Sequence, residues 1–159
     1  MLFAVATGFP MLLASWSSLF SSDPPYLVTF WASATLFFVV TTATLFTYVA
    51  RSEEVTHDQI YGGISVYLLL GLTWFAIYNL LEILTPGSFR GLSEVDGPFP
   101  IPSELLYYSF ITLTTVGYGD ITPVNSYARS LAILEAISGV LFVATFVARL
   151  VSMYRPDDN

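Results

Sequence analysis

Apolar residues dominate four long segments of the chain, and short polar stretches separate these segments. The segments cover about residues 1–20, 26–50, 60–84 and 127–154. An apolar run of about 20 residues is long enough to cross the roughly 30 Å hydrocarbon core of a bilayer as a helix. The pattern therefore predicts an all-α membrane protein with four transmembrane helices.

The first of these segments has a second interpretation. It is interrupted by Pro10 and could be a signal peptide that is cleaved. It lacks a basic region at its start, and its apolar run is long for a signal peptide. The spanning helix is therefore the favoured interpretation.

Polar stretches mark the boundaries of the predicted helices. Residues 21–25 contain paired prolines and predict a turn, because proline cannot continue a helix. Residues 51–59 are strongly polar and predict a linker, while residues 85–102 are rich in glycine and proline and predict a loop. Residues 155–159 form a polar tail.

A further segment, residues 103–114, is too short to cross the membrane. Ser103 is a candidate N-cap, and Glu104 lies where the positive end of a helix dipole favours an acid. We expect about three helical turns that enter the membrane and return as an extended segment. Non-helical backbone at that depth is tolerated only where it lines water or protein.

Composition supports a location in the cell membrane with the lipid bilayer as a partner. Of the 159 residues, 55% are hydrophobic and 11% are charged, and the mean hydropathy is +0.69. A soluble domain has about a quarter of its residues charged. The net charge of −7 argues against nucleic acid as a partner.

Enzyme and cofactor motifs are absent from the sequence. With no cysteine and a single histidine, the chain offers no disulfide framework, no thiolate metal site and no histidine cluster. It has no nucleophile elbow and no phosphate-binding loop. The sequence therefore predicts a protein that is not an enzyme and needs no cofactor.

The most specific motif is T-L-T-T-V-G-Y-G-D, which ends at Asp120. Gly117 and Gly119 can adopt positive φ at no steric cost, so neighbouring residues can alternate in handedness and their carbonyls can point the same way. The motif resembles the selectivity filter of potassium channels, including the aromatic residue between the glycines. In such a filter, carbonyl oxygens replace the water around a potassium ion.

The resemblance covers about the last hundred residues, which look like the two-helix pore module of the potassium channel superfamily. It implies a bacterial-type channel with two additional N-terminal spans. The implied pore domain, residues 60–154, comprises an outer helix (60–84), a turret (85–102), a pore helix (103–114), a filter (115–120) and an inner helix (127–154).

The resemblance also assigns a role to each filter residue. Permeant K+ would be coordinated by Thr115, Val116, Gly117 and Tyr118, with Gly119 completing the filter. Val116 and Tyr118 would point away from the ions and brace the strand against the helix behind it. One chain offers oxygens on one side of an ion only, so a homotetramer is implied.

Filter support is expected from three residues. Asp120 would close the outer end of the filter, and Thr112 precedes it in the motif. Some bacterial members of the family carry an acid four residues before the filter threonine, where this chain has Ile111. Asp120 therefore needs another partner, and we expect the hydroxyl group of Tyr107.

By the same alignment, Gly139 occupies the hinge position of the inner helix. The residues that would line the cavity and its inner mouth are valines, namely Val140, Val143, Val147 and Val151. Close helix packing is the alternative interpretation of the glycine. Contact with lipid or with the protein core is the alternative for the valines.

Glu135 lies within the last span, and an ionisable residue there is a functional-site hypothesis by default. We favour a structural role behind the filter, in which the carboxyl group hydrogen-bonds the pore helix or a neighbouring subunit. A proton sensor is the alternative.

In the pore module, the segment that carries the filter enters the membrane from the outer side. This orientation predicts cytoplasmic N- and C-termini. The positive-inside rule agrees by three arginines to two. Neither of the first two spans carries an arginine at every third position, so we expect weak voltage dependence. A non-selective cation channel of the same fold and a non-conducting accessory subunit are the alternative functions.

Overall fold

The computed structural model describes residues 24–51, 57–93 and 102–153. The predicted first span, the tail, and most of the turn at residues 21–25 therefore lie outside the described residues.

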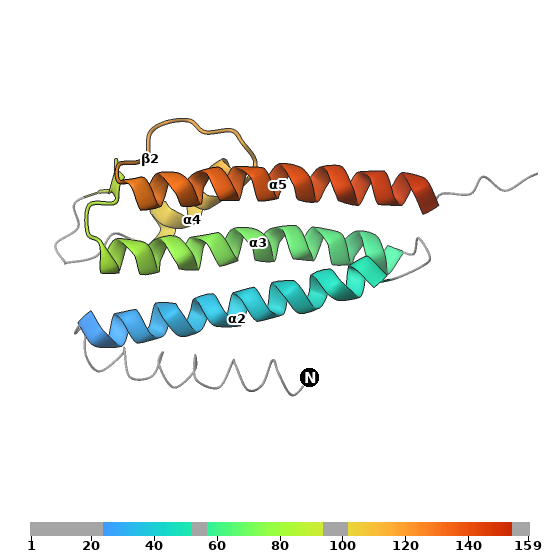
Figure 1. Cartoon of the computed structure of the whole chain (residues 1–159), viewed down its shortest axis with the longest axis horizontal. Helices are drawn as coiled ribbons and strands as arrows, with labels where there is room; N and C mark the ends of the chain where they lie inside the picture. The colour runs from blue at the N-terminus through green and yellow to red at the C-terminus, as the bar shows by residue number, and fades with distance from the viewer. Residues whose placement is uncertain (1–23, 52–56, 94–101, 154–159) are drawn as a thin grey trace, which may run out of the picture.

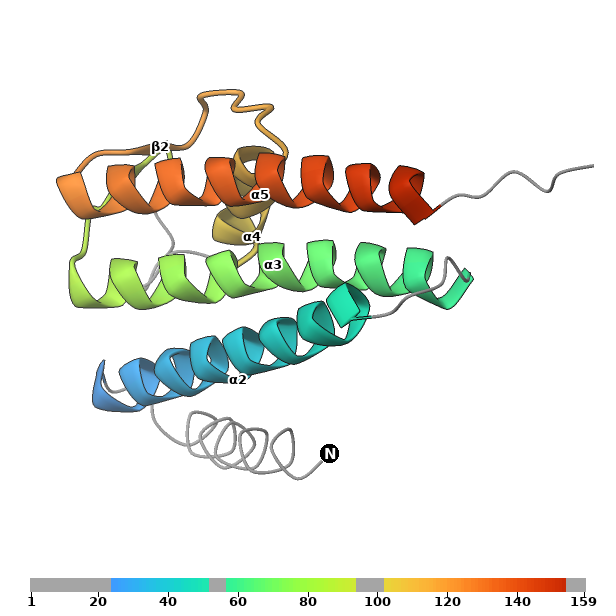
Figure 2. The same ribbon diagram turned by 45° about the vertical axis from the view of Figure 1, so that its right-hand side comes forward.

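Three long helices run side by side (Figures 1 and 2): α2 (Pro24–Arg51), α3 (His57–Leu84) and α5 (Ser126–Met153). In both views α3 lies between α2 and α5. Within the described ranges these are the helices long and apolar enough to cross a membrane. They correspond to three of the four spans that the apolar pattern predicts.

The helix bounds differ from the prediction around residues 51–59. Helix α2 continues to Arg51 and α3 already begins at His57, so part of the predicted linker is helical. Asp58 lies in the first turn of α3, where the helix dipole favours an acidic side chain. This polar start extends the helix beyond its apolar stretch.

The short helix α4 (Pro102–Leu113) packs against α3 and α5. It begins one residue earlier than predicted, so Ser103 lies inside the first turn and the predicted N-cap was wrong. Proline is tolerated in a first turn, because its missing N–H has no helical partner there.

The structure contains a small strand pair that the sequence analysis did not predict. It corrects the prediction of an all-α fold in which only loops connect the helices here. Strand β1 (Phe89–Arg90) pairs antiparallel with β2 (Thr122–Pro123), which aligns Phe89 with Pro123. The pair connects the segment after α3 with the segment before α5. Two-residue strands are too short to show an alternating pattern in the sequence.

An aromatic cluster fixes α4 against this strand pair. The rings of Tyr78, Phe89 and Tyr108 meet edge to face, with centroids 5.0 to 5.3 Å apart. Leu105, Ile121 and Ala128 complete the buried core around them. The cluster joins four elements, so it sets the height at which α4 ends and the motif begins.

Candidate functional site

Backbone hydrogen bonds hold the start of the extended segment, residues 115–117, against the carboxyl end of α4. The Thr115 amide donates to the Thr112 carbonyl at 2.9 Å. The amides of Val116 and Gly117 both donate to the Ile111 carbonyl, at 2.9 and 3.1 Å. Three consecutive N–H groups are thus turned toward α4.

The backbone of the motif alternates in handedness, as expected from its glycines. Gly117 has φ 52° and Gly119 has φ 82°. Thr115 has φ 59°, and it is the one non-glycine residue with positive φ within the described ranges. Such a conformation costs a threonine on the order of 1 kcal/mol or more. The hydrogen bonds to α4 hold it there.

Alternation of this kind turns successive carbonyls toward one side of a segment. No group of three His, Cys, Asp or Glu side chains that could hold a metal occurs in the part of the chain that the structure describes. A cation at this segment would therefore meet backbone and hydroxyl oxygens.

The side chains of Val116 and Tyr118, which flank Gly117, are exposed on the single chain. Val116 is 52% exposed and Tyr118 is 73% exposed. Their expected packing against the helix behind the strand therefore stays a prediction. On the single chain, most of the Tyr118 side chain is open to contact with another molecule.

Asp120 has the partner that the sequence analysis expected. The Tyr107 hydroxyl donates to Asp120 Oδ2 at 2.7 Å, and the Ile121 amide donates to Oδ1 at 3.0 Å. The hydrogen bond from Tyr107 holds the pKa of Asp120 below its ordinary value and raises the pKa of Tyr107 to about 12. The proton thus stays on the tyrosine and the charge on Asp120; a role in filter support remains a prediction.

The loop after β1 also closes on the outer end of the motif, which sequence reasoning missed. Gly91 has φ 92°, and a Cβ there would lie 2.0 Å from the Asp120 carbonyl oxygen. Glu104 accepts hydrogen bonds from the amide and hydroxyl groups of Ser93, at 2.9 and 2.5 Å. Only the glycine-rich character of this loop could have hinted at the contact.

Glu135 is fully buried and joins two neighbouring helices. The Tyr78 hydroxyl on α3 donates to its Oε2 at 2.5 Å, and the Ser109 hydroxyl on α4 lies 2.6 Å from its Oε1. The Ser109 hydroxyl also lies 2.8 Å from the Gly71 carbonyl. The carboxyl group therefore contacts the pore-helix candidate, as the structural interpretation expected.

Gly139 lies where α5 passes the end of α4. A Cβ at this position would lie 2.2 Å from the Leu113 carbonyl oxygen, so the two backbones meet closely. Close packing is thus present, whereas a hinge role is a separate prediction. The four valines predicted to line a cavity are each 47 to 69% exposed on the single chain.

Three helices suited to a membrane, with a short helix and a returning segment between two of them, define a multi-pass membrane protein. The sequence profile of a family described as "Ion channel" matches residues 67–155, more than half of the chain. The chain belongs to this family, and the matched half is a pore module of the potassium channel superfamily.

The relatives agree with this assignment. The "Two pore potassium channel c" of Oryza sativa subsp. japonica is 34% identical over 86 residues, which are 54% of this chain and 17% of that protein. The mouse "Potassium voltage-gated channel subfamily A member 6" is 31% identical over 83 residues, 52% of this chain and 16% of that protein. "Protein LctB" of Bacillus caldotenax is 30% identical over 105 residues, 65% of this chain and 78% of that protein.

The chain thus spans less than a fifth of the length of the plant and mouse relatives, but most of the length of the bacterial one. No solved structure matches the chain.

Proposed function

We propose that the chain is the subunit of a potassium-selective channel. Residues 115–120 of four copies surround the ion path, and K+ passes through it down its gradient. The observation that carries the proposal is the alternating backbone at Thr115, Gly117 and Gly119, with the amides of residues 115–117 turned toward α4. Carbonyls of Thr115, Val116, Gly117 and Tyr118 replace the ion's water. Several relatives carry the name of potassium channels.

The exposed residues of the single chain support the fourfold arrangement. Tyr118 and the valine face of α5 leave large apolar side chains uncovered. In a homotetramer, Val116 and Tyr118 pack against a neighbouring subunit, and the valines face the central cavity. Gly139 then lies where the inner helix bends during gating, and both termini lie in the cytoplasm.

The test is ion flux into liposomes that contain the purified protein, with potassium and sodium gradients compared. Gly119→Ala places a methyl group on a residue with φ 82°, which strains the motif itself. We expect K+ uptake well above Na+ uptake for the wild type and loss of K+ uptake or of its preference in the variant.

Gly87→Ala is the matched control. Gly87 has φ 80°, and a Cβ at either glycine meets no atom within 4 Å. The two substitutions therefore carry a similar backbone strain, but Gly87 lies outside the motif. Equal K+ and Na+ flux in the wild type would favour a non-selective channel, and absence of flux from an intact tetramer would favour an accessory subunit.

A further inference from the structure

The carboxyl group of Glu135 lies where α3, α4 and α5 meet, and both of its oxygens are engaged. The Tyr78 hydroxyl on α3 donates to Oε2 at 2.5 Å, and the Ser109 hydroxyl on α4 lies 2.6 Å from Oε1. The side chain is 0% exposed. An ionisable residue within a membrane span is costly and is a candidate functional residue by default. What this carboxyl group does must therefore follow from its contacts within the protein.

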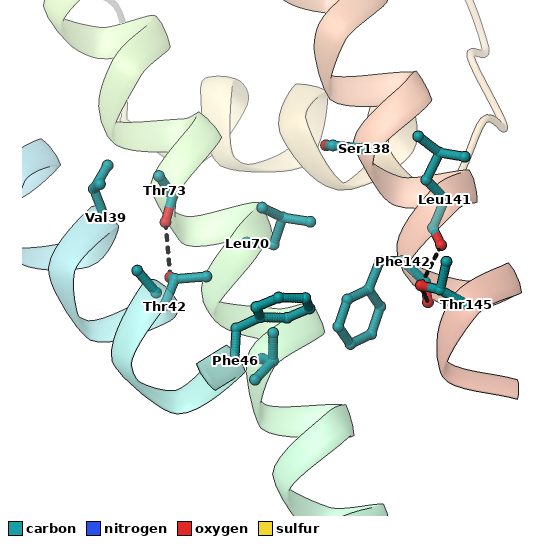
Figure 3. Close-up of a pocket in the computed structure, with 11 residues that line it drawn as sticks. Val39, Thr42, Phe46, Leu70, Thr73, Ser138, Leu141, Phe142 and Thr145 are labelled. Carbon is teal, nitrogen blue, oxygen red and sulfur yellow. Dashed lines mark hydrogen bonds between the residues drawn. The ribbon is translucent and has the colours of Figure 1, made fainter. Parts of the chain in front are cut away.

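Helix α3 also fixes the next turn of α5. Trp74 Nε1 donates to the Ser138 hydroxyl at 3.2 Å, and that hydroxyl donates to the Glu135 backbone carbonyl at 2.8 Å. Ser138 borders an apolar hollow of about 420 Å³ between α2, α3 and α5 (Figure 3). Glu135 does not line this hollow, so its carboxyl group contacts protein neighbours and not an occupant of the hollow.

On α4, Ser109 is held from two directions. Its hydroxyl is fully buried and lies 2.8 Å from the Gly71 carbonyl on α3, in addition to its contact with Glu135 on α5. The ring of the neighbouring Phe110 packs on the same glycine, where an added Cβ would lie 2.7 Å from it. This turn of α4 is thus fixed to the backbone of α3 and to the side chain of Glu135.

The fixed turn directly precedes the carbonyl that organises the motif. Ile111 lies two residues after Ser109, which is about 3 Å along the helix. The Ile111 carbonyl accepts the amides of Val116 and Gly117. Because two residues of a hydrogen-bonded helix move as one body, a displacement of Ser109 carries the Ile111 carbonyl with it. The start of the extended segment then moves as well.

We propose that Glu135 is a positioning residue for ion selectivity, which acts through Ser109 to hold the end of α4 and residues 115–117 in the geometry that prefers K+ to Na+. The inference rests on the proposed function of the motif. A binding geometry is kept within about 0.5 Å only where the supporting side chains are themselves locked by packing and hydrogen bonds. Glu135 meets this condition, because Tyr78 holds the oxygen that does not face Ser109.

The test compares thermal unfolding of the purified protein in detergent with KCl and with NaCl at equal concentration. An ion that binds the folded protein raises its melting temperature by mass action, so the difference between the two salts measures the preference for K+ without conduction. The ratio of K+ to Na+ uptake into liposomes is measured alongside.

Glu135→Ala should remove most of the difference between the salts and lower the uptake ratio about tenfold, the lower end of the effect of losing an outer-shell partner of a metal ligand. Glu135→Gln keeps an oxygen for Tyr78 and a donor for Ser109, and should retain both the difference and the ratio. Rescue by glutamine separates a positioning role from a requirement for charge.

Ser109→Ala and Ser138→Ala form the matched pair, because each removes one hydroxyl that has two hydrogen-bond partners. Ser109 connects Glu135 to α4, whereas the Ser138 hydroxyl bonds groups on α3 and α5. We expect Ser109→Ala to lose the preference for K+ and Ser138→Ala to keep it, even where both variants melt at a lower temperature.

An unchanged preference for K+ in Glu135→Ala, or in Ser109→Ala if the first variant does not fold, would overturn the inference. An equal loss of preference in Ser138→Ala would show a general loosening of the helices and would overturn it as well. A wild type that prefers neither ion would contradict the proposed function itself, and this inference with it. The wild type therefore distinguishes the two failures.

Discussion

At the scale of single residues, the outer end of the motif depends on one hydrogen bond between side chains. Tyr107 and Asp120 are thirteen residues apart, and their oxygens lie 2.7 Å apart. The bond favours the ionised carboxylate, so its contribution is complete above the ordinary Asp pKa of about 3.9. It is lost as the pH falls through the lowered pKa of Asp120.

Tyr107→Phe removes this donor and should raise the titration midpoint of Asp120 toward the ordinary value. The outer end of the motif should then lose its order at a higher pH than in the wild type, with faster decay of K+ flux under acidic conditions. Carboxyl carbon NMR of the labelled protein measures the midpoint. Tyr61→Phe, an exposed tyrosine near the start of α3, is the control. A midpoint that does not move would contradict the assignment.

Sequence reasoning reached some of these residues and not others. Gly117, Gly119 and the Tyr107–Asp120 contact follow from the motif, because glycine permits positive φ and the missing acid at Ile111 leaves Asp120 in need of a partner. The positive φ of Thr115 could not be predicted, since it results from hydrogen bonds to α4. The glycine-rich loop hints at a close backbone contact, but nothing local in the sequence identifies Asp120 as the partner of Gly91.

At the scale of elements, α3, α4 and α5 meet at the carboxyl group of Glu135. A hydroxyl has one proton, yet the Ser109 hydroxyl lies within hydrogen-bond distance of both the Gly71 carbonyl and Glu135 Oε1. If its proton goes to the carbonyl, which can only accept, the contact with Glu135 requires a donor at residue 135.

Glu135→Gln supplies such a donor through its amide group, while its oxygen accepts from Tyr78. We therefore expect a thermal stability close to that of the wild type. Glu135→Ala leaves the buried Tyr78 hydroxyl without its acceptor, which should cost about 1–3 kcal/mol, whereas the Ser109 hydroxyl keeps the Gly71 carbonyl. Thermal unfolding followed by circular dichroism compares the two. A glutamine variant as unstable as the alanine variant would show that the contact requires a carboxylate.

The elements themselves were predictable to different degrees. Three long helices follow from apolar length alone, because a bilayer requires about 20 residues. The β1–β2 pair joins residues more than thirty positions apart through two residues on each side, which leaves no periodic signal. Tyr78 lies 57 residues from Glu135, so only the fold reveals their contact.

At the scale of the whole molecule, the single chain leaves an apolar face of α5 uncovered. The valines that recur along α5 are 47 to 69% exposed, and the side chains of Val116 and Tyr118 are exposed as well; the four valines are Val140, Val143, Val147 and Val151. If four copies close around this face, the mass in mild detergent should be four times 17.5 kDa. Native mass spectrometry or light scattering with detergent correction measures it. A monomeric or dimeric mass under conditions that preserve K+ flux would contradict the fourfold proposal.

One carbonyl, that of Ile111, receives the amides of both Val116 and Gly117. The consequence concerns how this protein can change its length over evolution. An insertion or deletion of one residue between positions 111 and 117 would shift both amides away from their shared acceptor and exchange the positions that have positive φ. We therefore expect the backbone geometry of the motif to tolerate changes of length on either side of this stretch but not within it.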